Sequence, residues 1–169
     1  DVPEGLRRIV GVWDFNVDAG TLGALQVTVR YDENEAVVTR TDYYYVAGSA
    51  EDLDWTVSYD VEGLTAAEQR TSTDKLTSAA YYGAESDPQY TIGFRGGVPS
   101  TKSYYTDTDD NDYDDLVETY KATGDFTINA DGTIAVDLTD GRLLSKSYYY
   151  MEDIGTTARN ELEMTEYVL

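Results

Sequence analysis

The chain has 169 residues, of which 33 are acidic and 12 are basic, so its formal charge at pH 7 is −21. It contains no Cys and no His, which excludes disulfides, thiol nucleophiles, iron–sulfur clusters, His-ligated haem and the usual zinc sites. The negative charge makes nucleic acid and anionic membrane poor partners, and no apolar run is long enough to predict a transmembrane segment.

Short segments rich in Val, Ile, Thr and Tyr alternate with clusters of Gly, Asp and Asn, which is typical of antiparallel β-structure. The sequence Thr65-Ala66-Ala67-Glu68 has the spacing of a capping box and predicts a short helix over 66–70. An acidic run follows at 107–115, with a helical turn expected from Leu116. In chain order, we expect strands up to this run at residues 8–17, 25–31, 36–46, 55–61, 76–82, 90–95 and 102–106.

The last third of the chain has clearer turn signals. Asp131-Gly132 predicts a hairpin between strands at 124–129 and 133–138. Asp140-Gly141 predicts the next turn, before strands at 143–151 and 159–168. We therefore expect a single all-β domain, residues 1–169, with nine or ten strands and one or two short helices. The frequent short turns favour an antiparallel meander that closes into a barrel, or alternatively a β-sandwich or jelly roll.

Two segments carry a resemblance to a known family. Gly11-Val12-Trp13 on the first strand resembles the Gly-x-Trp signature of lipocalin-like barrels, and residues 124–134 look like a hairpin of secreted bacterial lipocalin-like proteins. The resemblance implies that Trp13 closes one end of a barrel and that Arg159, on a late strand, packs over it. The chain lacks the cysteines of many animal members and the long helix that follows their barrel.

Three segments share an order of hydroxyl, basic and hydroxyl residues followed by tyrosines: residues 39–45, 101–105 and 145–150. Because side chains alternate along a strand, such segments put aromatic surface on both faces. They are either good strand-forming residues only or a surface that stacks on sugars or packs against another subunit. The candidate binding residues are Tyr43, Tyr45, Tyr104, Tyr148 and Tyr150.

The acidic run has oxygen-bearing side chains at the first, third, fifth, ninth and twelfth positions of a twelve-residue loop, 107–118. It resembles the EF-hand calcium loop, although Asp112 replaces the usual Gly at the sixth position and no helix pattern precedes the loop. The alternative is an acidic loop that binds no ion. The resemblance implies six calcium ligands, with a backbone carbonyl from the tyrosine: Asp107, Asp109, Asn111, Tyr113, Asp115 and Glu118.

No catalytic constellation stands out. Carboxylates are too numerous for one pair to be singled out, and Gly93-Phe94-Arg95-Gly96-Gly97 lacks the lysine and the helix of a phosphate-binding loop. We therefore expect a non-enzymatic, calcium-binding β-protein that binds a small apolar or carbohydrate ligand or a protein partner. The alternatives are a structural subunit that self-assembles through Tyr-rich strands, and a lipocalin-like barrel enzyme without covalent catalysis.

The acidic residues are 21 Asp and 12 Glu, and Lys occurs only four times. Such a surface stays hydrated in salt, which screens its self-repulsion over roughly 8 Å. This composition favours an extracellular or cell-surface location in a saline environment over an acidic cytosolic protein. A start at Asp1, without Met or an apolar leader, is what we expect of a processed secreted protein or of a trimmed chain.

Overall fold

The computed structural model describes residues 8–16, 21–65, 68, 73–85, 87–106, 116–130, 132–154 and 157–167. For residues 8–16, 21–23, 150–154 and 157–167 this description covers the backbone alone. Regular structure in the described part of the chain is almost entirely β-strand. No helix there has the length and hydropathy that crossing a membrane requires.

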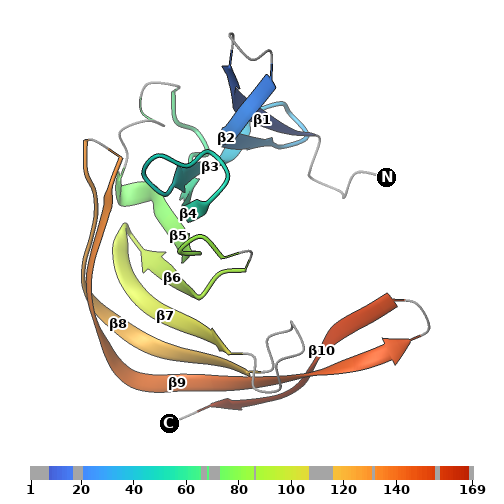
Figure 1. The fold of residues 1–169 in the computed structure, drawn as a ribbon. Helices are drawn as coiled ribbons and strands as arrows, with labels where there is room; N and C mark the ends of the chain where they lie inside the picture. The colour runs from blue at the N-terminus through green and yellow to red at the C-terminus, as the bar shows by residue number, and fades with distance from the viewer. Residues whose placement is uncertain are drawn as a thin grey trace.

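The described residues form ten strands in one antiparallel sheet, in which each strand pairs with its neighbours in sequence. This is the predicted meander, and the curved sheet runs from β1 at one end to β10 at the other (Figure 1). The strands are β1 (Arg8–Asn16), β2 (Thr21–Tyr31), β3 (Val37–Tyr45), β4 (Leu53–Asp60), β5 (Leu76–Tyr81), β6 (Tyr90–Arg95), β7 (Val98–Thr106), β8 (Leu116–Ile128), β9 (Ile134–Ile154) and β10 (Thr157–Tyr167).

The predicted capping box is present. The Thr65 N–H donates to Glu68 Oε2 at 2.8 Å, and the Glu68 N–H donates to the Thr65 hydroxyl at 3.4 Å. The rest of the helix predicted at 66–70 lies outside the described residues. A three-residue 3-10 helix, η2 (Thr73–Lys75), precedes β5.

Two local predictions are wrong. Leu116 begins a strand rather than a helical turn, because it pairs with Thr106 of β7 on one side and Tyr148 of β9 on the other. Asp140-Gly141 is not a turn between strands but lies inside β9, which runs unbroken over 21 residues. Pairing with β8 keeps this segment extended, and Asp140 lies opposite Ala122.

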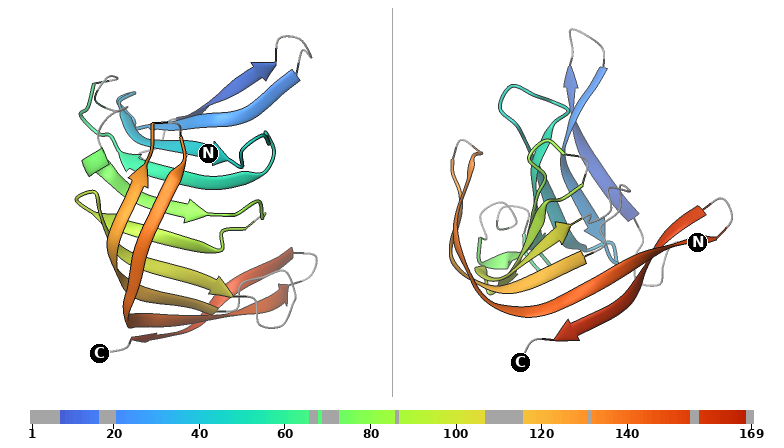
Figure 2. Two further views of the ribbon diagram at one scale, coloured as in Figure 1. Left: turned by 60° about the vertical axis from the view of Figure 1, so that its left-hand side comes forward. Right: turned by 60° about the horizontal axis from the view of Figure 1, so that its bottom comes forward.

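The outer half of the β8–β9 hairpin, residues 122–140, crosses one face of the sheet; we call it the β8–β9 arm (Figure 2). Register shifts flank Tyr120, where the arm begins, and such irregularities bend strands. Gly124 permits the close pairing beyond this point. Its φ is 128°, and a Cβ there would lie 2.1 Å from the carbonyl oxygen of Asp137.

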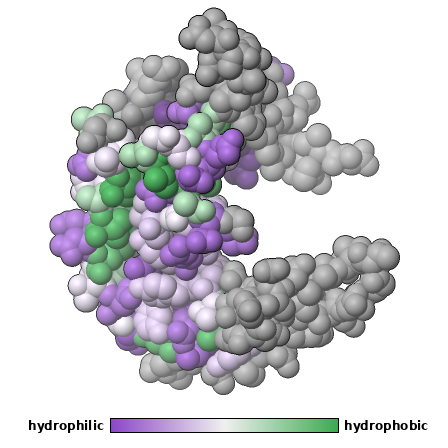
Figure 3. Space-filling model, in the orientation of Figure 1, coloured by the Kyte–Doolittle hydropathy of each residue, from purple (hydrophilic) through white to green (hydrophobic). Residues whose placement is uncertain are grey.

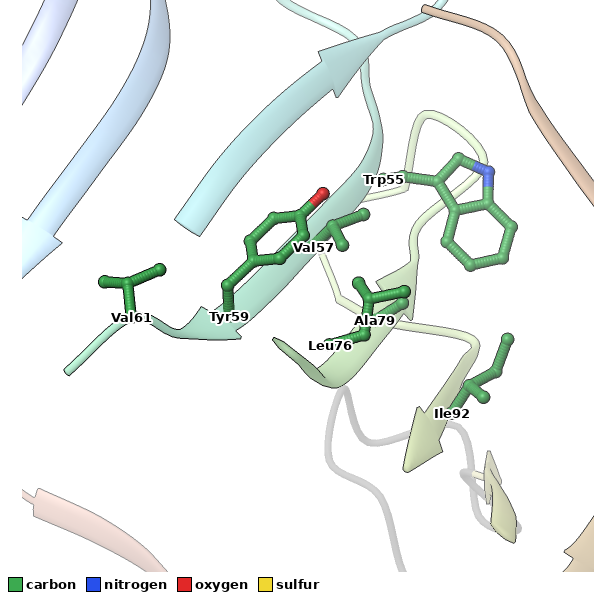
Figure 4. Close-up of a cluster of buried hydrophobic side chains, with 7 residues drawn as sticks. All are labelled: Trp55, Val57, Tyr59, Val61, Leu76, Ala79 and Ile92. Carbon is green, nitrogen blue, oxygen red and sulfur yellow. The ribbon is translucent and has the colours of Figure 1, made fainter. Parts of the chain in front are cut away.

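The core lies between this arm and the central strands, so we call the face that the arm crosses the covered face. The arm contributes five half-buried side chains, Phe126, Ile128, Ile134, Val136 and Leu138. Hydrophobic residues gather in a strip on the side where the arm runs (Figure 3). The strands and the loop after β4 contribute the buried cluster Trp55, Val57, Tyr59, Val61, Leu76, Ala79 and Ile92 (Figure 4).

The described sheet is not closed into a barrel. Among the described strands, β1 pairs with β2 only and β10 pairs with β9 only, so the first and last strands are opposite edges. The arm bends away to cover the central strands, and β9 does not lead β10 round to β1 (Figure 1). The side chains of Trp13 and Arg159 lie outside the described residues, and the strands that carry them are these two edges.

Candidate functional site: an aromatic row on the covered face

Five aromatic residues lie opposite one another on five consecutive strands. The register pairs Tyr44 with Trp55, Trp55 with Tyr81, Tyr81 with Tyr90, and Tyr90 with Tyr104. We call these five residues the aromatic row. Side chains at directly opposed positions share one face, and this face holds Trp55 of the core. The row is therefore an extension of the core toward β7.

From Trp55 to Tyr104, each ring of the row contacts the next. Ring centroids are 4.9 Å apart for Trp55 and Tyr81, 5.0 Å for Tyr81 and Tyr90, and 5.9 Å for Tyr90 and Tyr104. These spacings and the tilted planes are those of favourable aromatic pairs. Phe126 of the arm packs edge-on against Trp55, with ring centroids 5.7 Å apart, so the arm covers the row at Trp55.

The β7 end of the row is polar. The ammonium of Lys102 lies 4.1 Å from the ring centroid of Tyr90 and 4.7 Å from that of Tyr104, which are cation–π distances. The Tyr104 hydroxyl donates to Asp140 Oδ2 at 2.5 Å. The register continues from Tyr104 to Glu118 and then Lys146, which form an ion pair.

The polar end has perturbed proton affinities. The hydrogen bond from Lys146 lowers the pKa of Glu118 and raises that of Lys146, so both groups stay charged. Burial raises the pKa of Tyr104, and its bond to Asp140 raises that pKa further. Burial also raises the pKa of Tyr90 to about 12, with contributions from Tyr81 and Asp54. At pH 7, Tyr90 and Tyr104 are therefore neutral and lie beside the charged pair Glu118 and Lys146.

The other face of the same strands is different. Positions adjacent to the aromatic row carry small residues, all with hydroxyl groups except Ala80, and we call them the hydroxyl row. Thr41 and Ser58 bond at 2.9 Å on this face, as do Ser103 and Thr119. The hydroxyl row starts opposite Tyr43 and consists of Thr56, Ala80, Thr91, Ser103, Thr119 and Ser145.

The described residues form surface depressions away from the aromatic row. One, of about 410 Å³, lies where the arm meets η2 and the β6–β7 turn, with Leu76, Phe126 and Ile128 among its lining residues. The turn is Gly96-Gly97, so the glycine-rich segment forms a hairpin turn between β6 and β7. Another, of about 550 Å³, is lined by Arg30, Asp60 and hydroxyl-bearing residues at one end of β2–β5. Neither depression contains a residue of the aromatic row.

The structure does not bring the predicted binding tyrosines together. Tyr104 belongs to the aromatic row, and Tyr148 lies two positions from Lys146 on the same side of β9. Tyr43 and Tyr45 alternate with Tyr44 and lie on the opposite face, where Tyr43 lies 3.5 Å from the Thr28 hydroxyl and the Tyr45 hydroxyl donates to the Leu25 carbonyl at 2.9 Å. The side chain of Tyr150 is outside the described residues.

Most of the acidic loop, residues 107–115, is outside the described residues, and with it five of the six predicted calcium ligands. Only Glu118 is described, and it lies in a strand with Lys146 as its ion-pair partner. The helix that leaves an EF-hand loop is therefore replaced by β8. Within the described residues, no group of three or more acidic side chains is arranged to hold a metal.

Four residues of the row were not among the predicted site residues: Tyr44, Trp55, Tyr81 and Tyr90. The signal was one aromatic residue on the same side of each successive strand. Reading it requires the cross-strand register, which the bulges between Tyr44 and Tyr45 and between Gly93 and Phe94 make hard to deduce.

Comparison of the chain with protein-family models, with curated proteins and with solved structures gives no match.

Proposed function

We propose that this protein is a non-enzymatic binding module that takes a carbohydrate at the β7 end of the aromatic row. The observation that supports this is the aromatic row itself, which ends in half-buried rings beside charged groups. Aromatic rings offer apolar area and a polar edge at low conformational cost. Lys102, Glu118, Asp140 and Lys146 supply donors and acceptors for sugar hydroxyls next to those rings.

The same geometry favours a sugar over the small apolar ligand of a carrier. Pockets for apolar ligands are mostly lined by hydrophobic side chains, with few polar groups. At the β7 end, by contrast, two lysines and two carboxylates lie next to Tyr104 or in register with it on the neighbouring strands. The carrier function would need the lipocalin-like barrel, which forms only if β1 also pairs with β10. That closure stays a proposal, supported by the meander order of the strands.

Calcium binding by residues 107–118 belongs to this proposal. The loop joins Thr106 to Leu116, so its ends lie two residues from Tyr104 and Glu118 of the candidate site. A cation there would relieve repulsion among seven acids in twelve residues. It would also compete with Lys146 for Glu118. We propose an extracellular or cell-surface location in saline surroundings, which the Asp-rich composition supports.

The carbohydrate proposal is tested on an array of immobilised glycans, followed by calorimetry with the soluble oligosaccharide that binds best. Tyr104→Ala should weaken binding at least tenfold, about 1.4 kcal/mol, because it removes a ring and frees Asp140. Tyr43→Ala is the matched control. It also removes a tyrosine, but from β3 and from the face of the sheet opposite to the aromatic row. Equal losses in the two variants, or no glycan binding at all, would contradict the proposal.

Calcium binding is tested by thermal unfolding with and without the ion. Calcium should raise Tm, because it binds only the folded loop. Asp109→Ala should remove most of the gain, whereas Asp125→Ala, an exposed acid on the arm, should leave it intact. Glu118→Gln is a less clean test, because it also breaks the ion pair with Lys146.

A second candidate function is assembly into a larger structure. The observation that favours it is the open sheet, whose edges β1 and β10 each pair on one side only among the described strands. Free edges accept further strands. Because each copy carries a charge of −21, we expect assembly to strengthen with salt and calcium. Light scattering across a salt and calcium series tests this, and assembly that dissolves as salt rises would contradict it.

A further inference from the structure

β1 is an edge strand whose backbone is regular. Among the described strands its partner is β2, and the register shifts of this pair leave the extra residues on β2. Val12 and Trp13 are consecutive in β1, whereas their partners Val27 and Leu25 are separated by one residue. The outer side of β1 therefore offers an uninterrupted series of backbone donors and acceptors over Arg8–Asn16.

The two edges of the sheet differ in charge. β10 carries one arginine and three glutamates over Thr157–Tyr167, which is the pattern that protects an edge from pairing. β1 carries one arginine and one aspartate and is otherwise apolar apart from Gly11 and Asn16. In a chain of charge −21, β1 is thus an edge without net charge and with strong strand propensity.

We propose that β1 pairs antiparallel with β1 of a second copy of this chain, centred on Gly11, to form a two-fold symmetric dimer. In this register, Arg8 lies opposite Asp14 of the second copy, Ile9 opposite Trp13, and Val10 opposite Val12. The symmetry repeats each pair, so the dimer gains two Arg8–Asp14 pairs. The two sheets then continue as one across the interface.

The self-complementary order of charges identifies a second copy as the partner. Arg8 and Asp14 are equally far from Gly11, with five uncharged residues between them, so one antiparallel register matches both charges at once. A register centred on Val10 would place Arg8 opposite Val12 and leave Asp14 unmatched. Pairing β1 with β10 would bring three glutamates to the interface instead. The inference rests on the assembly function proposed above and specifies the strand that performs it.

Charge-swap variants test the register by sedimentation equilibrium of the full chain in moderate salt. Arg8→Asp places like charges opposite each other at two positions, and so does Asp14→Arg, so each should weaken the dimer about tenfold or more. The double variant R8D/D14R restores opposite charges and should restore the wild-type Kd. Because the single variants change net charge in opposite directions, a general charge effect would move their Kd values apart. Arg159→Asp, on the β10 edge, is the matched control and should leave the dimer unchanged.

The outcomes separate this inference from the assembly function. Weakening by both single variants and recovery in the double variant support β1 pairing, and circular dichroism of the same samples excludes loss of fold as the cause. A dimer that ignores both swaps assembles through another surface, which overturns the inference and leaves the assembly function standing. A wild-type chain that stays monomeric up to a concentration of about 1 mM overturns both β1 pairing and the assembly function.

Discussion

The two faces of strands β3–β8 share one backbone and differ in almost everything else. On one face, a row of aromatic residues spans five strands, and the β8–β9 arm packs on it at Trp55. On the other face, which the β8–β9 arm does not cross, the adjacent positions carry threonine, serine and alanine. Because side chains alternate along each strand, the residue next to a ring on the covered face is a small side chain, mostly with a hydroxyl group, on the other face.

This contrast shows where the stability of an open sheet comes from. Burial of apolar area contributes roughly 25 cal/mol per Å², and the hydroxyl row buries little of it. Val57 and Ile92 are fully buried on the covered face, whereas Thr56 and Thr91, the residues beside them, are half-buried. The arm, rather than closure of a barrel, therefore gives the sheet its second layer. Variants on the two faces should differ accordingly.

The largest expected effect comes from the close pairing of the two strands of the β8–β9 arm at Gly124. Gly124→Ala would place a Cβ 2.1 Å from the Asp137 carbonyl oxygen at a φ of 128°, so the arm must shift. We expect a loss of ~3–5 kcal/mol in the free energy of unfolding, measured by urea denaturation. Gly48→Ala is the control: its φ is 86° with no atom near the added Cβ, and it should cost only about 1 kcal/mol. Equal costs would show that the arm does not stabilise the sheet.

Adjacent residues of β6 compare the two faces directly. Ile92→Ala empties a fully buried position of the core and should cost ~2–5 kcal/mol. Thr91→Ala removes a hydroxyl that lies 3.1 Å from the Tyr105 hydroxyl on the other face, and should cost about 0.5–1.5 kcal/mol. Urea denaturation of both variants measures the difference. A Thr91 variant as unstable as the Ile92 variant would mean that a further layer covers the hydroxyl row.

The sequence predicts this fold well wherever local chemistry decides it. The strand expected at residues 90–95 is β6, the Asp131-Gly132 turn predicts the hairpin of β8 and β9, and Thr65 and Glu68 form the predicted cap. It fails at Leu116 and Gly141, where pairing with neighbouring strands overrides the local turn and helix signals. The sequence does not predict the aromatic row or the open sheet, because these depend on the cross-strand register and on the path of β9. A local sequence pattern determines neither of them.

A smaller effect is expected from the ion pair beside the aromatic row. Arg40 donates to both carboxylate oxygens of Asp42, at 2.6 and 2.9 Å, on the face that holds Tyr44. Asp42→Asn removes this partner and should cost ~1–3 kcal/mol at pH 7. Burial raises the pKa of Asp42 in the folded chain more than Arg40 lowers it. The folded state therefore binds the Asp42 proton more tightly than the unfolded state does. The contribution of Asp42 to stability falls as the pH rises from the ordinary pKa of an aspartate to the raised pKa of Asp42.

Unfolding of the Asp42→Asn variant and of the wild type between about pH 3 and pH 7 measures both effects. The variant should lose the part of the pH dependence that Asp42 contributes, so the gap between the two curves should change across this range. A constant gap would show that Asp42 titrates alike in the folded and unfolded chain.

The smallest predicted effect concerns alkaline pH and one tyrosine of the row. Burial, with Tyr81 and Asp54 nearby, raises the pKa of Tyr90 to about 12, so the folded chain keeps this proton after an unfolded chain, with a tyrosine pKa of about 10, has lost it. The stability that Tyr90 contributes is therefore fully present below about pH 10 and is lost as the pH rises toward 12.

Tyr90→Phe keeps the ring contacts with Trp55 and Tyr81 but removes the titrating hydroxyl. In the variant, the slope of the unfolding free energy against pH should become shallower in this window. The change should correspond to a difference of less than one bound proton, because the hydroxyl is only half-buried. Urea titrations at several alkaline pH values measure the slope, and the same titration at pH 7 gives the reference. An unchanged slope would place Tyr90 in solvent, and with it the part of the aromatic row on which the proposed binding site depends.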